Sequence, residues 1–413
     1  MSEKDLLAIY GGAKAVPELK ARFHFGQEEK DAVVQLFDKA IVSGEPFGYG
    51  GEEELAFCRE FSDFLGGGYA DGVNSGTNAI FTALYALGLK PFSEVIVSSI
   101  TDPGGMMPVV LNNCIPAVAD AAPGRFNTGP EQVEARITSQ TSAILVSHIA
   151  GEPADIKGIL EVADRHGIPV VEDCAQAYGA EVDGQLVGTF GAYGAFSLMF
   201  GKHICTGGQG GIVFTRSEEL YRKQLRAADR GKPFYMDAGN GNVIPALNCN
   251  MDELRAVIGR AQLKKLPGII ARRRHFVELL KQQGLEDLKI ISLPEQLPGA
   301  VSSYWWLRLK FNADQCSCSR KEFFTAMEAE GVSIVSRYQR AMPSAFAWFQ
   351  ERAGRHPWNN PLCQGDPCRD FPLPNTMRSL DENFICFIHE SWGEEEAAML
   401  LHAFRKLDAA FAG

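Results

Sequence analysis

The sequence lacks the long apolar run of a membrane-spanning helix and the basic tracts of a nucleic-acid-binding protein. No stretch of its 413 residues approaches the roughly 18 consecutive apolar residues of a membrane span. Its 40 basic residues are outnumbered by 51 acidic ones, which gives a net charge of −11, and they are scattered apart from Arg272, Arg273 and Arg274. We therefore expect neither a membrane nor a nucleic acid as a partner.

Signals for export and for metal binding are missing as well. The start, MSEKDLLAIYGG, has neither the basic region nor the apolar stretch of a secretory leader, so we expect a cytoplasmic protein. The ten cysteines include no pair with the C-x-x-C spacing of zinc and redox sites. We interpret them as reduced core thiols and expect no metal site, with Cys363 and Cys368 left open.

What the sequence does contain is the composition of a globular protein, with 46% hydrophobic and 22% charged residues. From residue 75 to residue 173, short apolar runs such as EVIVSS, SAILVSHIAG and IPVVED alternate with amphipathic segments such as DIKGILEVADRHG. This alternation predicts an α/β fold with a mainly parallel sheet, whose ligands lie beyond the carboxyl ends of the strands.

The pattern of predicted helices and strands changes after about residue 270. Before that point, the glycine-rich segment 191–215 predicts two strands joined by a loop, and MDELRAVIGRAQLKKL begins a long helical stretch. Beyond it, VSSYWWLRLKF reads as an alternating strand, SRKEFFTAMEAEG as a capped helix and EEEAAMLLHAFRKLDAAF as a closing helix. We predict a large α/β domain over residues 1–270, including an N-terminal segment, and a smaller α+β domain over 271–413 with an antiparallel sheet.

Three short patterns carry possible chemistry, and each has a structural alternative. Gly76 and Thr77 follow Ser75 at the start of a predicted helix, where a phosphate could bind but where a serine is also an ordinary helix cap. Asp173 ends a buried strand, so it faces a ligand, a cation or a helix cap. Lys202 lies in an apolar, glycine-rich segment of the sequence. It is either a surface residue whose amine reaches the solvent or a desolvated amine suited to forming a Schiff base.

The order of these patterns resembles the motif series of the DegT/DnrJ/StrS family of pyridoxal-phosphate sugar aminotransferases. SGT is followed by EDCAQA and then by Ser197 and Lys202 ahead of GGQGG; the likeness extends from LAIYGG through GEPADIKGI to Asn248-Cys249-Asn250-Met251. The resemblance implies fold type I, with a large mainly parallel α/β sheet domain and a smaller C-terminal domain. It also implies an aminotransferase that uses pyridoxal 5'-phosphate and its pyridoxamine form.

The resemblance assigns a role to each matching residue. Lys202 corresponds to the lysine that binds the cofactor as a Schiff base and moves a proton, and Asp173 to the acid that pairs with the pyridine nitrogen. The remaining cofactor-binding positions are Gly76, Thr77 and Ser197 at the phosphate, Gln176 near the ring, and Asn248, which reaches the phosphate of the neighbouring subunit. A homodimer with shared active sites follows from that last assignment.

Three positions depart from the family pattern. Asp102 stands where an aromatic ring usually stacks on the cofactor, so this carboxylate is expected near the cofactor face and at the acceptor substrate. Gln209 replaces the glutamate of a G-E-G-G loop, and Asn250 replaces a common arginine. We therefore expect no ring stacking from residue 102 and no arginine clamp for an anion at residue 250.

The expected reaction transfers an amino group from glutamate or glutamine to a keto sugar, nucleotide-linked, or to a cyclitol ketone. Two alternatives stay open: a non-catalytic or regulatory relative that keeps the cofactor, and a sugar dehydratase. The dehydratases of this family carry histidine in place of the lysine, whereas here His203 only follows Lys202, and we interpret it as structural. A dinucleotide or P-loop site is excluded because GGQGG has the wrong spacing.

Overall fold

The computed structural model describes residues 6–237, 239, 241–351, 357–363 and 370–413. At its centre is a seven-stranded sheet in the order β1-β9-β8-β5-β4-β2-β3, in which only β9 runs against the other strands. The strands are β1 (Tyr69–Val73), β2 (Glu94–Ser98), β3 (Ile115–Ala119), β4 (Thr141–Ser147), β5 (Val170–Asp173), β8 (Tyr193–Ser197) and β9 (Gly211–Thr215). The predicted mainly parallel α/β sheet is confirmed.

Helices cover both faces of this sheet because its strands are apolar on both sides. On β2, for example, Ile96 packs into one core with α2, α5, α6 and α8, whereas Val95 and Val97 pack into another with α3, α4 and α7. The helices are α2 (Glu52–Phe64), α3 (Gly76–Ala86), α4 (Met107–Leu111), α5 (Pro130–Glu134), α6 (Ile156–His166), α7 (Glu218–Ala228) and α8 (Glu253–Gln282).

A second, antiparallel sheet lies in the C-terminal part, in the order β10-β12-β14-β13. Helices α9 and α12 pack on it, as the sequence predicts, and Ser319 caps α9 by accepting a hydrogen bond from the N–H of Glu322. Its elements are β10 (Ile291–Ser292), β12 (Leu307–Phe311), β13 (Ile334–Val335), β14 (Asn383–Cys386), α9 (Arg320–Ala329), α11 (Pro374–Glu382) and α12 (Glu394–Phe411). The shorter or more peripheral elements are α1 (Gln27–Ser43), α10 (Ala347–Gln350), β6 (Glu181–Val182), β7 (Gln185–Leu186) and β11 (Ala300–Val301).

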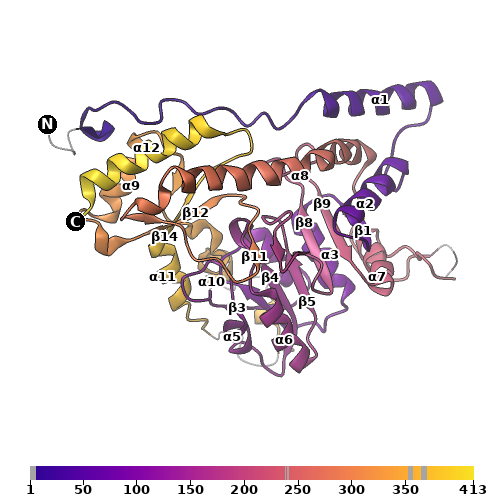
Figure 1. Cartoon of the computed structure of the whole chain (residues 1–413). Coiled ribbons are helices and arrows are strands. Elements are labelled where there is room, and N and C mark those ends of the chain that lie inside the picture. The colour runs from indigo at the N-terminus through magenta and orange to yellow at the C-terminus, as the bar shows by residue number, and fades with distance from the viewer. Residues whose placement is uncertain (1–5, 238, 240, 352–356, 364–369) are drawn as a thin grey trace.

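Helix α8 connects the two sheets and runs through the predicted boundary near residue 270 without a break (Figure 1). Ile270 still packs into the core of the large sheet, and Phe276, less than two turns later, packs into that of the small one. Leu7 and Val16, from the start of the chain, also pack into the small core. The division at residue 270 stays a prediction, and Leu7 and Val16 pack with the C-terminal part.

The predicted strand VSSYWWLRLKF is only partly correct. The structure has strands at β11 and β12 and an irregular segment between them, where Tyr304 adopts a positive φ of 48°. Arg273 donates hydrogen bonds to the carbonyl oxygens of Tyr304 and Trp305. These oxygens therefore bind a side chain instead of the backbone of a neighbouring strand. This break places two tryptophans at the edge of the large sheet rather than in the small one.

Two further expectations concern the cysteines and the membrane. The nine cysteines among the described residues are all free thiols; Cys363 is half-buried, and Cys368 lies outside the described residues. None of the helices that the structure describes combines the length and the apolar character needed to cross a bilayer.

Candidate active site

Lys202 lies in the loop between β8 and β9, beyond the carboxyl end of β8. Its side chain is buried, and its Nζ lies 4.0 Å from the centre of the indole ring of Trp305. Burial lowers the pKa of Lys202 to about 8, against the opposing charges of Asp173 and Asp102. An amine with this pKa is partly unprotonated near neutral pH, so it can act as a nucleophile and as a proton carrier.

Asp173 is the last residue of β5 and lies at the same edge of the sheet. Its Oδ1 accepts a hydrogen bond from the N–H of Ala175 at 3.0 Å, and its Oδ2 accepts one from the hydroxyl of Ser147 at 3.3 Å. Burial raises the pKa of Asp173, although the Ala175 N–H and the charge of Lys202 lower it. The ionised carboxylate is therefore costly here, and a positively charged N–H group would offset that cost.

The turn at Ser75, Gly76 and Thr77 begins α3. Ser75 caps the helix, since its Oγ accepts from the N–H of Asn78 at 3.1 Å, so the structural alternative considered for this serine is correct. The N–H groups of Gly76 and Thr77 occupy the first two helical positions, where no intrahelical acceptor exists. A β-carbon at Gly76 would lie 2.5 Å from the Cβ of Ser197, so only glycine lets this helix start pack against the end of β8.

An aromatic wall, made of Trp305, Trp306 and Tyr338, faces these residues from the C-terminal part. The rings of Trp305 and Trp306 stack with centroids 3.9 Å apart, and Tyr338 meets Trp306 edge-on. Gln176 is buried beside the wall; its Nε2 lies 3.5 Å from the Tyr338 hydroxyl, and its Oε1 accepts from the N–H of Ala150 at 2.8 Å. The adjacent tryptophans are the sequence signal for this wall. The sequence pattern predicts that they belong to a strand, but β12 begins only at Leu307.

Asp102 has a local structural partner. Its side chain is exposed, and its Oδ1 accepts a hydrogen bond from the N–H of Gly104 at 2.9 Å, which caps the single 3-10 turn Pro103–Gly105. That turn lies between two site residues, because a β-carbon at Gly104 would overlap Thr77 and one at Gly105 would lie 3.1 Å from Oδ2 of Asp173. Asp102 thus lies at the site, and its cap explains how an acid is tolerated where the family pattern has a ring.

Asn248 is the candidate that the fold does not bring to Lys202 within one chain. Its segment runs beside the end of β1, where the N–H of Asn74 donates to the carbonyl of Cys249 at 2.8 Å. The Asn248 side chain is exposed and accepts a hydrogen bond from the side chain of Asn250 at 2.8 Å. Its predicted contact with a neighbouring subunit remains a prediction.

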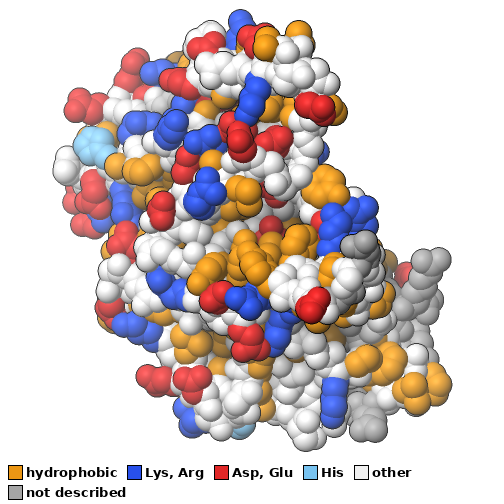
Figure 2. Space-filling view, turned by 90° about the vertical axis from the view of Figure 1, so that its right-hand side faces the viewer, with side chains coloured by type: hydrophobic (Ala, Val, Ile, Leu, Met, Phe, Trp, Pro, Cys, Tyr) orange, Lys and Arg blue, Asp and Glu red, His pale blue; other side chains and the backbone are white. Residues whose placement is uncertain are grey.

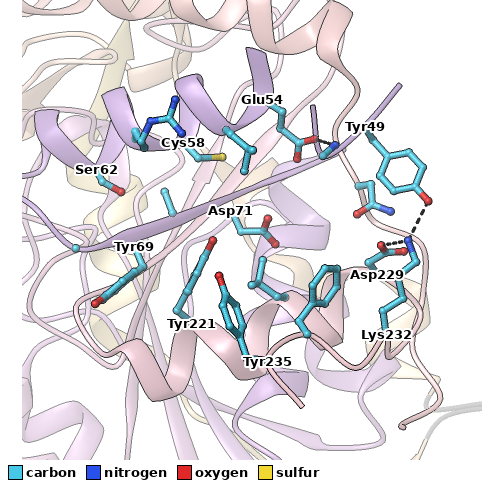
Figure 3. A pocket seen from close by; sticks show the side chains of 18 of the residues that line it. Tyr49, Glu54, Cys58, Ser62, Tyr69, Asp71, Tyr221, Asp229, Lys232 and Tyr235 are labelled. Atoms are coloured by element: carbon cyan, nitrogen blue, oxygen red, sulfur yellow. Dashed lines mark hydrogen bonds and ion pairs between the residues drawn. The ribbon is translucent and has the colours of Figure 1, made fainter. Parts of the chain in front are cut away.

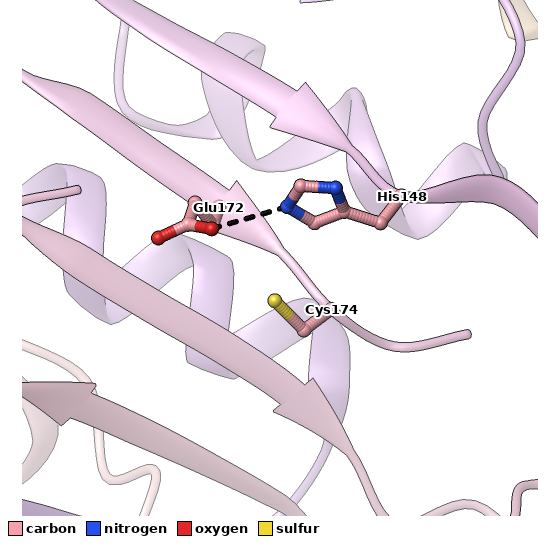
Figure 4. A group of neighbouring side chains, drawn as sticks. All are labelled: His148, Glu172 and Cys174. Atoms are coloured by element: carbon pink, nitrogen blue, oxygen red, sulfur yellow. Dashed lines mark hydrogen bonds and ion pairs between the residues drawn. The ribbon is translucent and has the colours of Figure 1, made fainter. Parts of the chain in front are cut away.

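A buried group of His148, Glu172 and Cys174 lies at the carboxyl ends of β4 and β5 (Figure 4). His148 Nδ1 accepts from the N–H of Ala154, so its Nε2 carries the proton and donates to Glu172 at 3.1 Å. The Glu172 carboxylate also accepts three backbone N–H groups, from residues 188, 190 and 191. His148 and Glu172 thus use their polar atoms within the protein, and their hydrogen bond ties the end of β4 to β5.

His203, next to Lys202, is buried, and its Nε2 lies 3.1 Å from the carbonyl oxygen of Ser303. Burial lowers the pKa of His203 well below its ordinary value. It lies in the loop between β8 and β9, and its contacts agree with a structural role.

A separate cavity of about 570 Å³ opens at the β1 edge of the sheet (Figure 3). The carboxyl groups of Glu54 and Asp71 point into it, with Tyr221 and Tyr235 on the opposite wall. Burial raises the pKa of Glu54 to about 7 and that of Asp71 to about 8, so near pH 7 Glu54 is about half protonated and Asp71 is mostly protonated. None of the predicted site residues lines this cavity, and the chemistry collects instead around Lys202.

The comparisons with known proteins agree with this geometry. A model of the DegT/DnrJ/EryC1/StrS aminotransferase family matches residues 27–364. The chain belongs to this family. The resemblance drawn from the motifs is confirmed, and so is the fold class.

Three relatives illustrate the range of the family. The chain is 38% identical over 235 residues to the L-glutamine:2-deoxy-scyllo-inosose aminotransferase of Streptomyces kanamyceticus, a match that covers 55% of each protein. It is 32% identical to the UDP-N-acetyl-3-dehydro-alpha-D-glucosamine 3-aminotransferase of Acidithiobacillus ferrooxidans, over 78% of this chain and 84% of that one. The solved aminotransferase of Psychrobacter cryohalolentis superposes with a TM-score of 0.77 at 28% identity, over 94% of this chain and 98% of that one.

Proposed function

We propose that this family member is a pyridoxal-phosphate-dependent aminotransferase that transfers an amino group from glutamate or glutamine to a keto sugar or a cyclitol ketone. The observation that carries the proposal is the Lys202 amine, buried at the carboxyl edge of the parallel sheet, with its pKa lowered to about 8 and coupled to Asp173. A lysine that only snorkels to the surface would keep its amine in water.

The residues present fit pyridoxal 5'-phosphate. The phosphate would lie at the start of α3, against the N–H groups of Gly76 and Thr77 and the hydroxyl of Ser197, where the helix dipole favours an anion. Asp173 would pair with the protonated ring nitrogen, which supplies the positive N–H group that its buried carboxylate needs. Lys202 would hold the aldehyde carbon, and Gln176 would lie beside the ring.

The cofactor supplies an electron sink that makes the proton next to the amino group acidic. With the cofactor bound, Lys202 would accept that proton on Nζ and release it again, which its pKa of about 8 allows near neutral pH. Asp173 would be ionised beside the ring nitrogen and would keep that nitrogen protonated. Trp305 covers the amine of Lys202 and limits the access of water to it.

The acceptor class follows from the relatives' names and not from this site. One relative is named for a scyllo-inosose and glutamine, and another for a UDP-linked 3-keto sugar. A dehydratase is disfavoured because Lys202 occupies the position at which the family's dehydratases carry histidine. A purely regulatory relative is disfavoured because the buried amine and acid are both present.

We further infer a cytoplasmic homodimer with shared sites. Helix α1 exposes four large apolar residues to solvent, Val34, Phe37, Ile41 and Val42, which suits contact with a second copy. Hydrophobic side chains gather near the middle of the face that lies to the right in Figure 1 (Figure 2). The Asn248 side chain is exposed on this chain, as a contact with a second copy requires.

The test is a reconstitution with pyridoxal phosphate followed by a panel of substrates. Borohydride reduction should attach the cofactor to the peptide that carries Lys202. The pyridoxamine form should then be offered keto sugars, free and nucleotide-linked, and cyclitol ketones, with recovery of the aldehyde form as the readout. Labelling at another lysine, or no recovery with any ketone after proven loading, would contradict the proposal.

A further inference from the structure

The backbone of the Lys202 turn, residues 201–203, is held by an arginine from the N-terminal part of the chain. Arg22 donates from Nη2 to the carbonyl oxygens of Lys202 at 2.8 Å and His203 at 3.1 Å, and from Nη1 to that of Gly201 at 3.4 Å. Its Nε donates to Oε1 of Glu390 at 2.9 Å. The guanidinium group of Arg22 thus connects three consecutive carbonyls of the turn to one carboxylate.

Glu390 links Arg22 to a second arginine, Arg273. Its Oε2 lies 2.8–2.9 Å from two nitrogens of Arg273, which is almost fully buried. Arg273 in turn donates to the backbone carbonyl of Trp305 at 2.8 Å, and the indole N–H of Trp305 donates to the carbonyl of Gly201 at 3.0 Å. The contacts thus form a closed ring, which runs from the Lys202 turn through Arg22, Glu390, Arg273 and Trp305 and back to the turn.

The amine itself has no comparable anchor. Within the part of the chain that the structure describes, Nζ of Lys202 makes no hydrogen bond and lies against the face of the Trp305 ring. The position of the amine is therefore set by the backbone that carries it and by the indole ring beside it. Both are held by the arginines that share Glu390.

We propose that Arg22 is a positioning residue for Lys202, which holds the lysine backbone through its three carbonyl contacts so that the amine stays buried against Trp305. The inference rests on the proposed role of Lys202. It predicts that the fork geometry matters and not the charge alone, because a guanidinium group serves several acceptors at once whereas an ammonium group acts as a point charge. Glu390 keeps Arg273 when Arg22 is lost, so the fold should survive the substitution.

The experiment uses the cofactor-free full chain, so it does not depend on transaminase activity. Hydrogen exchange is followed for residues 199–206, and the pKa of Lys202 is measured from the pH dependence of its acetylation by acetic anhydride. The variants are Arg22→Gln and Arg22→Lys. Arg260→Gln is the matched control, because Arg260 is also half-buried and binds two carboxylates, those of Glu53 and Glu60, away from the site.

In Arg22→Gln, exchange in 199–206 should accelerate about tenfold or more, since hydrogen bonds from a charged donor are among the stronger ones. The Lys202 pKa should rise from about 8 toward its ordinary 10.5 as the amine gains water, with Asp173, Asp102 and Trp305 still facing it. Arg22→Lys should behave like the glutamine variant, and Arg260→Gln like the wild type.

Three results would overturn the inference: an unchanged pKa and exchange rate in Arg22→Gln, an acceleration spread over the whole chain, or full rescue by Arg22→Lys, which would assign the effect to charge. A wrong function proposal would be recognised separately, by the failure of the wild-type chain to bind pyridoxal phosphate at Lys202.

Discussion

Replacing Asp173 with asparagine is predicted to slow the enzyme and to stabilise the cofactor-free protein at neutral pH. The substitution removes the negative charge that would pair with the ring nitrogen. Removing one member of a buried charge pair costs about 2–5 kcal/mol. At ~1.4 kcal/mol per factor of ten, both half-reactions should slow by about 30-fold to 5,000-fold.

The gain in stability follows from the direction of the pKa shift. Burial raises the pKa of Asp173 above its ordinary 3.8, so the folded state binds its proton more tightly than the unfolded state does. Stability therefore falls as the pH rises from the ordinary pKa through the raised one, and at pH 7 the ionised carboxylate is a net cost. Asparagine never ionises, so the thermal midpoint of Asp173→Asn should exceed that of the wild type at pH 7, with the gap narrowing below about pH 4.

The assays are calorimetric or fluorescence melts of the cofactor-free chain at several pH values, and single-turnover half-reactions of the loaded enzyme. Asp120→Asn is the matched control. Asp120 is equally buried and directly follows β3, but its carboxylate accepts the N–H groups of Asn375 and Thr376 at 2.9 and 2.8 Å. That substitution should lower the thermal midpoint and spare the half-reactions. A melt of Asp173→Asn below that of the wild type at pH 7, or an unchanged rate, would refute the reasoning.

Three other predictions concern Asp102, the dimer and the C-terminal sheet. Asp102→Phe should keep cofactor binding and the donor half-reaction but impair transfer to the acceptor in single-turnover measurements. Asp102→Asn is the control, because its side-chain oxygen should still accept the hydrogen bond from Gly104. If both half-reactions of Asp102→Phe ran at the wild-type rates, the role of Asp102 would be limited to this cap. Mixing inactive Lys202→Ala and Asn248→Ala chains should restore part of the activity, because one site of each heterodimer carries neither lesion; no recovery after proven subunit exchange would mean unshared sites. Arg308→Ala should destabilise the chain by about 3–5 kcal/mol in equilibrium unfolding, because it leaves the buried Glu152 unpaired, and a loss below 1 kcal/mol would contradict this.

The large sheet could be predicted because its signals are local. Apolar runs bounded by turns specify β2, β4 and β5, and the acid at the end of β5 marks the edge where ligands bind. Ser75 and its helix were equally readable, since a cap and its helix are neighbours in sequence. The predicted grouping of Gly76 with Ser197 needed the family resemblance, because 121 positions separate two residues that touch only in the fold.

The wall around the amine could not be predicted in the same way. Trp305 and Trp306 directly precede the alternating run from Leu307 to Phe311, so the sequence pattern includes them in one strand. Periodicity cannot show that Arg273 donates hydrogen bonds to the carbonyl oxygens of Tyr304 and Trp305. Arg22 lies in a segment without helical or strand periodicity, and nothing local distinguishes it from a surface arginine. Its partners are the Lys202 turn and Glu390, both far away in sequence.

These contacts also bear on when the site forms. The cover over the Lys202 amine, Trp305, belongs to the C-terminal part, and the clamp on its backbone, Arg22, belongs to the start of the chain. The large sheet by itself carries Lys202 and Asp173 but neither of the groups that keep the amine out of water. Since burial is the main cause of the lowered Lys202 pKa, an amine with this pKa requires that the segments carrying Arg22 and Trp305 are both docked on the sheet. The buried amine of Lys202 is thus a product of the completed fold and not of the sheet that carries it.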